Sequence, residues 1–330
     1  MRADLVVVGA GPGGLSAAAA GRARGWRTVV LEATGEVGGL WARVRPDMRC
    51  LSLRRYDRLP DGEGVEGAAE RAVASEVLAA WRAFADRARL DVRFGQRVTA
   101  LRRGEGWRLT AGDVYEAPRV VLATGSYERP WVPELPGRFD GPACHSSALS
   151  IADVERGERV VVVGFGNSAA EWVPRLLARG AEVTVSGQAG RPASIGRGLR
   201  GRLAWWVSGL PVRWAPGVLG CSGGVPVVDD DVHRAVAAGT VSQVGRAVGL
   251  TVAGVVTEAG EVPADRVVWA TGYRRDLRWA GLGTGEPAQT EGLSTELPGV
   301  GFVGIDCMRT RRSGFLRGIP ADARAVVARL

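Results

Sequence analysis

The sequence contains no lysine and is poor in histidine and cysteine. Its 43 basic residues are all arginine and stand against 35 acidic residues, and the 330 residues include only two histidines and four cysteines. No two cysteines form a Cys-x-x-Cys pair, so a dithiol redox centre and a cysteine zinc site are not expected. Neither histidine lies in the nucleophile-elbow context of a hydrolase. We therefore expect no metal site and no hydrolytic triad.

A long block of basic residues and a long apolar run are absent too. The densest basic cluster, Arg309, Arg311 and Arg312, is short, and arginine-rich, lysine-free composition is typical of a high-GC genome. The net charge of +8 is therefore weak evidence for a nucleic-acid partner. Glycines interrupt the apolar N-terminal stretch, which is shorter than the ~20 residues of a membrane span and unlike a secretory signal. We expect a cytoplasmic protein without nucleic-acid partners or a membrane span.

One pattern occurs twice, from Ala3 and again from Glu158. A valine-rich run, a glycine turn, an Ala-rich helix and a second valine-rich run follow one another in each copy. Such runs are typical of strands buried on both faces of a parallel sheet, so each copy predicts a βαβ unit. A buried run before Ala-Thr-Gly follows each unit. The sequence predicts an α/β fold of two dinucleotide-binding, Rossmann-like domains, with the second (151–280) inserted in the first (1–150 and 281–330).

The first glycine turn has the spacing G-x-G-x-x-G between a strand and a helix. Gly9 permits the tight turn, Gly11 permits the approach of a pyrophosphate, and Gly14 permits close helix–strand packing. Glu32, about 20 residues on, is expected to accept hydrogen bonds from ribose hydroxyls. The glycine pair in "EVGGLW" offers a second close backbone approach. The predicted contacts are Gly9, Gly11, Pro12, Gly13, Gly14, Glu32, Gly39, Leu40, Trp41, Val98, Ala123, Thr124 and Gly125.

The second turn has the looser form G-x-G-x-x-A, through Gly164, Gly166 and Ala169. No acidic residue follows its second strand near Ser186, which favours a 2′-phosphate and hence NADPH, with NADH as the alternative. Arg191 is the nearest cation for that phosphate, and a solvated loop arginine is its alternative interpretation. The predicted contacts are Gly164, Gly166, Asn167, Ser168, Ala169, Arg191, Ala270, Thr271 and Gly272.

Two dinucleotide sites in one chain, without redox cysteines or metal ligands, indicate a flavin that is reduced by a nicotinamide. The flavin then carries the chemistry, and the protein supplies binding, orientation and electrostatics. This explains why no acid–base pair stands out among the residues.

Over nearly its whole length the sequence resembles the flavin-containing monooxygenase family. Phe139, Gly141 and His145 match the family fingerprint F-x-G-x-x-x-H-x-x-x-(Y/F), whose last position is Leu149 here. "VVVGFGNSAAE", "EVGGLW" and "WATGYR" are similar to the family's NADP-binding turn, second flavin motif and late ATG element. The resemblance implies FAD in the first domain and NADPH in the second. It also implies oxygenation of a soft nitrogen or sulfur, or of a ketone, by O2 through a C4a-hydroperoxyflavin.

Two positions depart from the family pattern. The first is Leu149. The second is Leu51, which stands where members carry the Asn of an Asn-Ser pair beside the flavin, and Ser52 matches the serine of that pair. A leucine cannot donate the hydrogen bond that the Asn amide would donate. Ketone-oxidising relatives use an arginine near the flavin. The resemblance also implies that Asp306 contacts the ribityl chain. The catalytic candidates are His145, Ser52, Arg49 and Arg54.

We predict an FAD-dependent, NADPH-driven monooxygenase of a small molecule in secondary metabolism. The alternative is an NAD(P)H-dependent reductase, dehydrogenase or oxidase without oxygen insertion, and a third reading is a flavoprotein that binds nucleotide without turnover. Trp205, Trp206 and Trp214 leave open a substrate tunnel, a membrane surface, loop packing or a homodimer contact.

Overall fold

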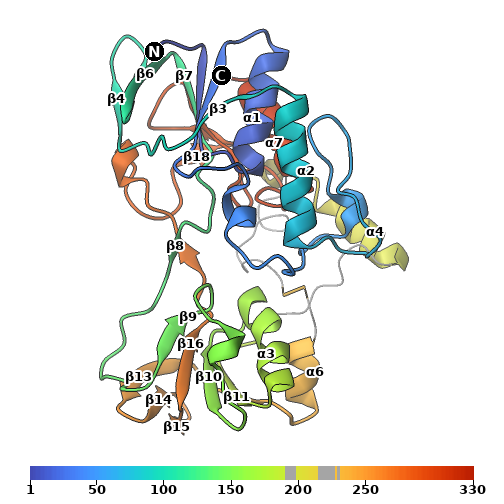
Figure 1. The fold of residues 1–330 in the computed structure, drawn as a ribbon, viewed down its shortest axis with the longest axis vertical. Helices are drawn as coiled ribbons and strands as arrows, with labels where there is room; N and C mark the ends of the chain where they lie inside the picture. The colour runs from blue at the N-terminus through green and yellow to red at the C-terminus, as the bar shows by residue number, and fades with distance from the viewer. Residues whose placement is uncertain (190–197, 215–226, 229–230) are drawn as a thin grey trace. The chain divides into compact units, whose positions relative to one another are not determined.

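The computed structural model describes residues 1–189, 198–214, 227–228 and 231–330 (Figure 1). The chain divides into two compact units. Unit 1 comprises Met1–Glu128, Ile195–Cys221 and Arg274–Leu330, and unit 2 comprises Arg129–Ser194 and Ser222–Tyr273. Each unit contains a parallel sheet, so the predicted α/β class is confirmed. The domain boundaries at 150 and 280, which concern the two cofactors, stay a prediction.

A seven-stranded sheet forms the centre of unit 1, in the order β18-β19-β20-β7-β1-β2-β3. Its strands are β1 (Leu5–Val8), β2 (Thr28–Leu31), β3 (Asp91–Arg93), β7 (Arg119–Leu122), β18 (Gln289–Thr290), β19 (Leu293–Ser294) and β20 (Val300–Phe302). The five strands from β20 to β3 run parallel. β1 and β2 are buried along their whole length, which is why both read as continuous apolar runs.

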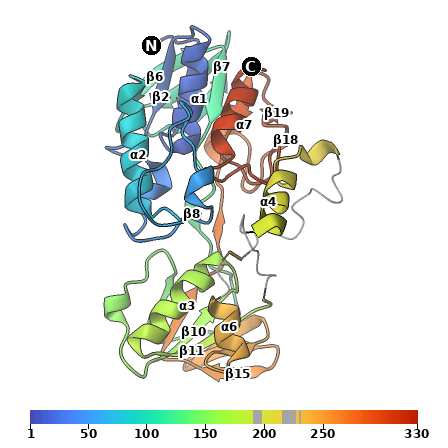
Figure 2. The same ribbon diagram turned by 90° about the vertical axis from the view of Figure 1, so that its right-hand side faces the viewer.

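Helices α1 (Pro12–Ala23) and α7 (Ile319–Val327) pack against strands of this sheet. The other helices described in unit 1 are α2 (Ala74–Arg87) and α4 (Gly198–Val207) and the short helices η1 (Gly39–Ala42), η2 (Arg54–Tyr56), η4 (Val212–Trp214) and η5 (Arg278–Ala280). Helices α1 and α7 lie side by side (Figures 1 and 2). Unit 1 also holds an antiparallel meander of β4 (Ala100–Arg103), β5 (Trp107–Ala111) and β6 (Asp113–Ala117).

Unit 2 is built on a five-stranded sheet in the order β12-β11-β10-β16-β9, with every pair parallel. The strands are β9 (Ala143–His145), β10 (Arg159–Val163), β11 (Glu182–Ser186), β12 (Ser242–Val244) and β16 (Arg266–Trp269), and the helices are η3 (Ile151–Asp153), α3 (Asn167–Arg179) and α6 (Asp231–Ala237). An antiparallel sheet joins β13 (Ala247–Thr251), β14 (Gly254–Thr257) and β15 (Gly260–Pro263). β8 (Arg129–Pro130) pairs with β17 (Tyr273–Arg274), near the first and last residues of unit 2.

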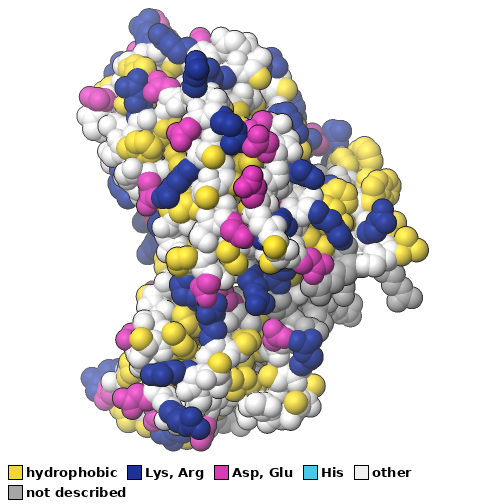
Figure 3. Space-filling view, turned by 45° about the vertical axis from the view of Figure 1, so that its right-hand side comes forward, with side chains coloured by type: hydrophobic (Ala, Val, Ile, Leu, Met, Phe, Trp, Pro, Cys, Tyr) yellow, Lys and Arg dark blue, Asp and Glu magenta, His cyan; other side chains and the backbone are white. Residues whose placement is uncertain are grey.

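Arginine and acidic side chains are intermixed over the face shown in Figure 3. Hydrophobic side chains gather there over α4, where Leu199, Leu203 and Trp206 are exposed. Trp214 is exposed as well, whereas the ring of Trp205 stacks on Tyr56 with 4.4 Å between centroids. The three tryptophans therefore do not share one environment.

Candidate functional site

Two glycines of the first turn are required by the fold itself. Gly9 follows β1 with φ +100°, and a Cβ on it would lie 2.6 Å from the carbonyl oxygen of Ala123. A Cβ on Gly14 would lie 1.8 Å from the carbonyl oxygen of Gly9. No real side chain tolerates these distances, so the two glycines let β1, α1 and the Ala-Thr-Gly turn approach each other.

Gly11 differs, because nothing in the chain requires a glycine there. Its φ of −77° suits any residue, and the nearest atom to an added Cβ is the Cα of Gly39, at 3.7 Å. Gly11 is also the N-cap of α1, and no side chain caps that helix. The first amides of α1 therefore have no side-chain partner, and such amides favour an anion. The bare backbone here fits a bound pyrophosphate.

Glu32 holds the first turn in place. The Ala10 N–H donates to its Oε2 at 2.7 Å, while the N–H and hydroxyl of Thr34 each donate to its Oε1 at 2.9 Å. The carboxylate is buried, so these bonds compensate the loss of water. Carboxylate oxygens can accept further bonds, which leaves capacity for ribose hydroxyls. Glu32 thus clamps the turn to β2 in addition to its predicted role.

The Ala-Thr-Gly turn of unit 1 follows β7 and lies beside the C-terminal end of β1. The Ala123 N–H donates to the Val8 carbonyl at 2.9 Å, and Thr124 and Gly125 line a small space together with Arg275. The buried guanidinium of Arg275 contacts the side chains of Ser126 and Glu286. Sequence reasoning did not single out this arginine, although it directly follows the late ATG motif.

The remaining residues predicted for the first nucleotide lie on surrounding elements. Leu40 and Trp41 are half-buried in η1, and Val98 is buried against the core of unit 1. Burial raises the pKa of the Asp306 carboxyl above its ordinary value, against the opposing effect of Arg275. Their contacts with a nucleotide stay a prediction.

The second turn repeats the geometry of the first in unit 2. Gly164 has φ +111°, and a Cβ on it would lie 2.4 Å from the Ala270 carbonyl oxygen, as Gly9 approaches Ala123 in unit 1. Gly166, the equivalent of Gly11, has φ −100°, and beyond its chain neighbours no atom of the described residues lies within 4 Å of an added Cβ. It caps α3 without a side-chain hydrogen bond. Gly166 therefore has no function in the fold that alanine could not serve, which fits a bound phosphate.

Other residues predicted for the second nucleotide serve the fold of unit 2. The Val228 N–H donates to Oδ1 of Asn167 at 2.9 Å, and the Ser186 hydroxyl donates to the Gly245 carbonyl at 2.8 Å. Ala169 is fully buried at the start of α3, while Ser168 is half-buried. Arg191, the predicted partner of a 2′-phosphate, lies outside the described residues.

The fingerprint from Phe139 to Leu149 is a packing motif of unit 2. A Cβ on Gly141 would lie 2.5 Å from the ring of Phe139, so the glycine makes room for that ring. His145 accepts the Ser147 N–H at Nδ1 and therefore donates from Nε2 to the Gly272 carbonyl at 3.0 Å. Leu149 is buried in an apolar cluster. The leucine at the family's aromatic position is thus a core side chain.

His145 is expected to stabilise unit 2 in a pH-dependent way. Burial lowers its pKa, so below the ordinary histidine value of about 6.5 the unfolded chain binds a proton that the folded chain resists. Stability should therefore fall as the pH drops below about 6.5. His145→Ala should lose about 2–3 kcal/mol at pH 8 through two hydrogen bonds and buried contact. Urea unfolding between pH 5 and 8 measures both effects. A variant of unchanged stability but abolished turnover would instead indicate a catalytic histidine.

The catalytic candidates near residue 52 are also engaged by the fold. Arg54 donates from Nε to the Ala69 carbonyl at 2.7 Å and from Nη2 to Glu76 at 2.8 Å. Arg49 is exposed, and its backbone bridges to Val73. The Ser52 hydroxyl, fully buried, donates to Oδ1 of Asp57 at 2.5 Å. Arg54 thereby anchors the segment before α2, which makes it a structural arginine in this conformation.

Leu51 is half-buried beside Ser52. No group of three potential metal ligands occurs among the described residues. Within that same part of the chain, no helix has the length and apolar character needed to cross a membrane.

Comparison with known proteins gives three likenesses of note. An indole-3-pyruvate monooxygenase, YUCCA1, from Oryza sativa subsp. japonica is 29% identical over 330 residues, covering 88% of this chain and 81% of the relative. A flavin-containing monooxygenase from Stenotrophomonas maltophilia matches 99% of this chain and 98% of its own, with a TM-score of 0.83 and 25% identity. A bacillithiol disulfide reductase from Staphylococcus aureus matches 100% and 98% of the two chains, with a TM-score of 0.71 and 17% identity, which shows the fold alone.

The predicted resemblance and the prediction of a flavin-dependent monooxygenase are confirmed by these likenesses. They also support the use of a flavin, O2 and a small organic substrate. Residues 6–196 match the family described as pyridine nucleotide-disulphide oxidoreductase. The chain belongs to this family of pyridine nucleotide-disulphide oxidoreductases.

Proposed function

We propose that the chain is an FAD- and NADPH-dependent monooxygenase made of two Rossmann-like domains. Unit 1 would hold FAD over the turn from Gly9 to Gly14, and unit 2 would hold NADPH over the turn from Gly164 to Ala169. One observation carries this assignment: Gly11 and Gly166 are both glycines at uncapped helix starts where the chain has room for a Cβ. The flavin, when bound, supplies the redox and oxygen chemistry.

The chain's own residues bind and orient the two nucleotides. The uncapped amides of α1 and α3 would bind the phosphates, and Glu32, which accepts from the Ala10 N–H of the first turn, would also accept from the ribose hydroxyls. His145 ties β9 to the Gly272 turn, so the Ala-Thr-Gly element of unit 2 has one fixed position. Preorganised backbone of this kind orients cofactors without a charged catalytic side chain.

Arg246 is proposed to select NADPH over NADH. The Gly187 N–H donates to the Val244 carbonyl at 3.1 Å, and Ser186 bonds Gly245, so the segment before Arg246 lies beside the end of β11. The guanidinium of Arg246 is exposed and makes no hydrogen bond or ion pair with the described residues. Arg246→Gln should raise KM for NADPH about 10- to 100-fold and leave that for NADH nearly unchanged. Equal effects on both nucleotides would refute this selection role.

The fold is shared with a disulfide reductase, so the alternative of hydride transfer without oxygen insertion needs its own evidence. Dithiol exchange requires accessible thiolates. Cys50 and Cys144 are free, and burial raises the pKa of both thiols, which disfavours the reactive form. These two thiols therefore give the reductase alternative no support.

Anaerobic reduction tests the cofactor assignment. The purified protein should be yellow and should be bleached by NADPH faster than by NADH. A protein that carries no flavin after mild isolation would contradict the proposed function. A flavin that neither nucleotide reduces would contradict the role given to unit 2.

A further inference from the structure

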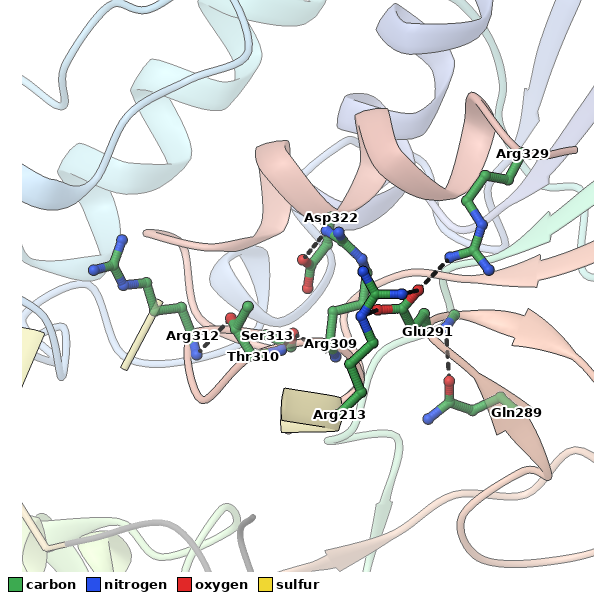
Figure 4. A network of polar contacts seen from close by, with 10 residues as sticks. Arg213, Gln289, Glu291, Arg309, Thr310, Arg312, Ser313, Asp322 and Arg329 are labelled. Atoms are coloured by element: carbon green, nitrogen blue, oxygen red, sulfur yellow. Dashed lines mark hydrogen bonds and ion pairs between the residues drawn. The ribbon is translucent and has the colours of Figure 1, made fainter. Parts of the chain in front are cut away.

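The loop between β20 and α7 carries four arginines, Arg309, Arg311, Arg312 and Arg317. Figure 4 shows Arg309 bonded to Asp322, with 3.0 Å between Nη1 and Oδ1, and Glu291 bonded to Arg213. The Arg312 guanidinium, in the same figure, points away from both carboxylates. The charge of Arg309 is therefore neutralised by a carboxylate of this network, whereas the charge of Arg312 is not.

Arg312 is held by uncharged groups. Its Nε donates to the Ser208 hydroxyl at 3.2 Å, its Nη2 contacts the Trp205 carbonyl, and its guanidinium carbon lies 3.5 Å from the centroid of the Trp205 ring. Burial lowers its pKa, and no acidic side chain pairs with it among the described residues. The indole and the carbonyl fix the cation in place but leave its charge uncompensated.

Arg317 is the stronger anomaly in this cluster. Its Nε and Nη1 are shielded from solvent and have no hydrogen-bond partner. Burial lowers its pKa to about 10, with a contribution from the like charge of Arg312, while Asp57 acts in the opposite direction. The guanidinium carbon lies 4.7 Å from the centroid of the Phe315 ring, a contact that leaves both shielded N–H groups without an acceptor. Shielded donors of a charged group are costly unless a hydrogen-bond acceptor meets them.

Two other side chains of the cluster also have unpaired polar atoms, Asp57 beside Arg317 and Trp205 beside Arg312. Oδ2 of the buried Asp57 and Nε1 of Trp205 lack partners, and the Trp205 ring stacks on Tyr56, the residue before Asp57. Burial raises the pKa of Asp57 to about 6, and Asp57 is the acidic side chain that acts on Arg317. Two guanidinium groups therefore stand against one carboxyl group in this cluster, and the donors of Arg317 and Trp205 have no hydrogen-bonded acceptor among the described residues.

We propose that Arg317, Arg312 and the indole N–H of Trp205 form an anion subsite that holds a carboxylate of the organic substrate. This inference rests on the proposed function, because the substrate in question is the molecule to be oxygenated. The subsite lies within unit 1, where the Ser52 hydroxyl donates to Asp57 beside Arg317. A carboxylate supplies both the countercharge and the acceptor atoms that the cluster lacks.

A matched pair of thioethers tests this subsite. (Phenylthio)acetate and methyl phenyl sulfide present the same sulfur, and only the first carries a carboxylate. In Arg317→Gln holoenzyme, kcat/KM for (phenylthio)acetate should fall about 10- to 100-fold, the range of a lost charged hydrogen bond, while the value for methyl phenyl sulfide stays within about threefold. Arg324→Gln is the control, since Arg324 is exposed on α7 of the same segment.

Binding provides a readout that does not depend on turnover. (Phenylthio)acetate should raise the melting temperature of the wild-type holoenzyme and of Arg324→Gln but not that of Arg317→Gln. Should Arg317→Gln fail to fold, Trp205→Phe removes one donor, keeps an aromatic ring, and should weaken the same binding.

Three results would overturn the subsite. The first is an equal loss of kcat/KM with both thioethers. The second is loss of FAD or of reduction by NADPH in Arg317→Gln, which would assign the arginine to a cofactor phosphate. The third is that (phenylthio)acetate does not bind to the wild type. If the wild type binds (phenylthio)acetate but carries no flavin after mild isolation, the proposed function fails while the subsite stands.

Discussion

Gly11→Ala is expected to yield a folded protein that purifies without its yellow cofactor. An added Cβ meets no atom of the chain closer than 3.7 Å, and the backbone is extended at this position, so the apo-protein should be as stable as the wild type or up to about 1 kcal/mol more stable. A pyrophosphate against that backbone has no room for the methyl group. FAD affinity should fall about 100-fold or more, or about 3 kcal/mol. Absorbance at 450 nm after gel filtration measures the FAD that is retained. Urea unfolding of the variant and wild-type apo-proteins measures the difference in stability.

Gly14→Ala and Gly104→Ala are the matched comparisons for Gly11. Gly14→Ala places a Cβ 1.8 Å from the Gly9 oxygen and should destabilise the apo-protein by about 1–3 kcal/mol or more. Gly104 has open space around an added Cβ and lies in the turn between β4 and β5, so its variant should keep both stability and FAD. If Gly11→Ala retains FAD, the proposal that FAD binds over this turn is wrong.

Gly166→Ala should keep FAD and lose reduction by NADPH. The position is open in the chain, so the fold of unit 2 should persist, whereas a methyl group at the start of α3 occupies the space proposed for the nicotinamide nucleotide's phosphates. The apparent affinity for NADPH in anaerobic stopped-flow reduction should fall about 100-fold. Reduction by dithionite should be unchanged, because it does not use this site.

The two glycine variants together decide which unit serves which nucleotide. If Gly166→Ala loses flavin and Gly11→Ala keeps it, the two sites are reversed. If both lose flavin, the variants act through the stability of the whole chain, and the melting temperatures would show it.

The glycine turns could be predicted from the sequence because their spacing reflects local geometry. A strand, a φ near +100° and a helix start allow few residue types, and the same pattern predicted Gly9 and Gly164 independently. The sequence did not show which glycines are required by contacts within the chain and which leave room for a ligand. Gly9 and Gly14 serve contacts within the chain, and Gly11 and Gly166 do not, a distinction that needs the coordinates.

Side-chain roles set by distant residues could not be predicted in the same way. His145 depends on the carbonyl of Gly272, which is 127 positions away. Arg54 depends on the Ala69 carbonyl before α2 and on Glu76 in the first turn of α2. Histidine and arginine are residue types that catalysis often uses, so both were predicted as catalytic candidates. Their hydrogen-bond partners, which only the structure shows, indicate a role in holding the fold. The electrostatic interaction between Asp57 and Arg317 likewise has no sequence signal, since the two residues lie far apart in the chain.

The most direct test of the monooxygenase assignment follows the oxygen atom. Under ¹⁸O2, with NADPH and an accepted thioether, the product sulfoxide should carry one ¹⁸O atom, and NADPH consumption should match sulfoxide formation. NADPH oxidation that yields stoichiometric hydrogen peroxide, with the thioether unchanged or labelled only from water, would contradict the assignment and leave a flavoprotein reductase or oxidase.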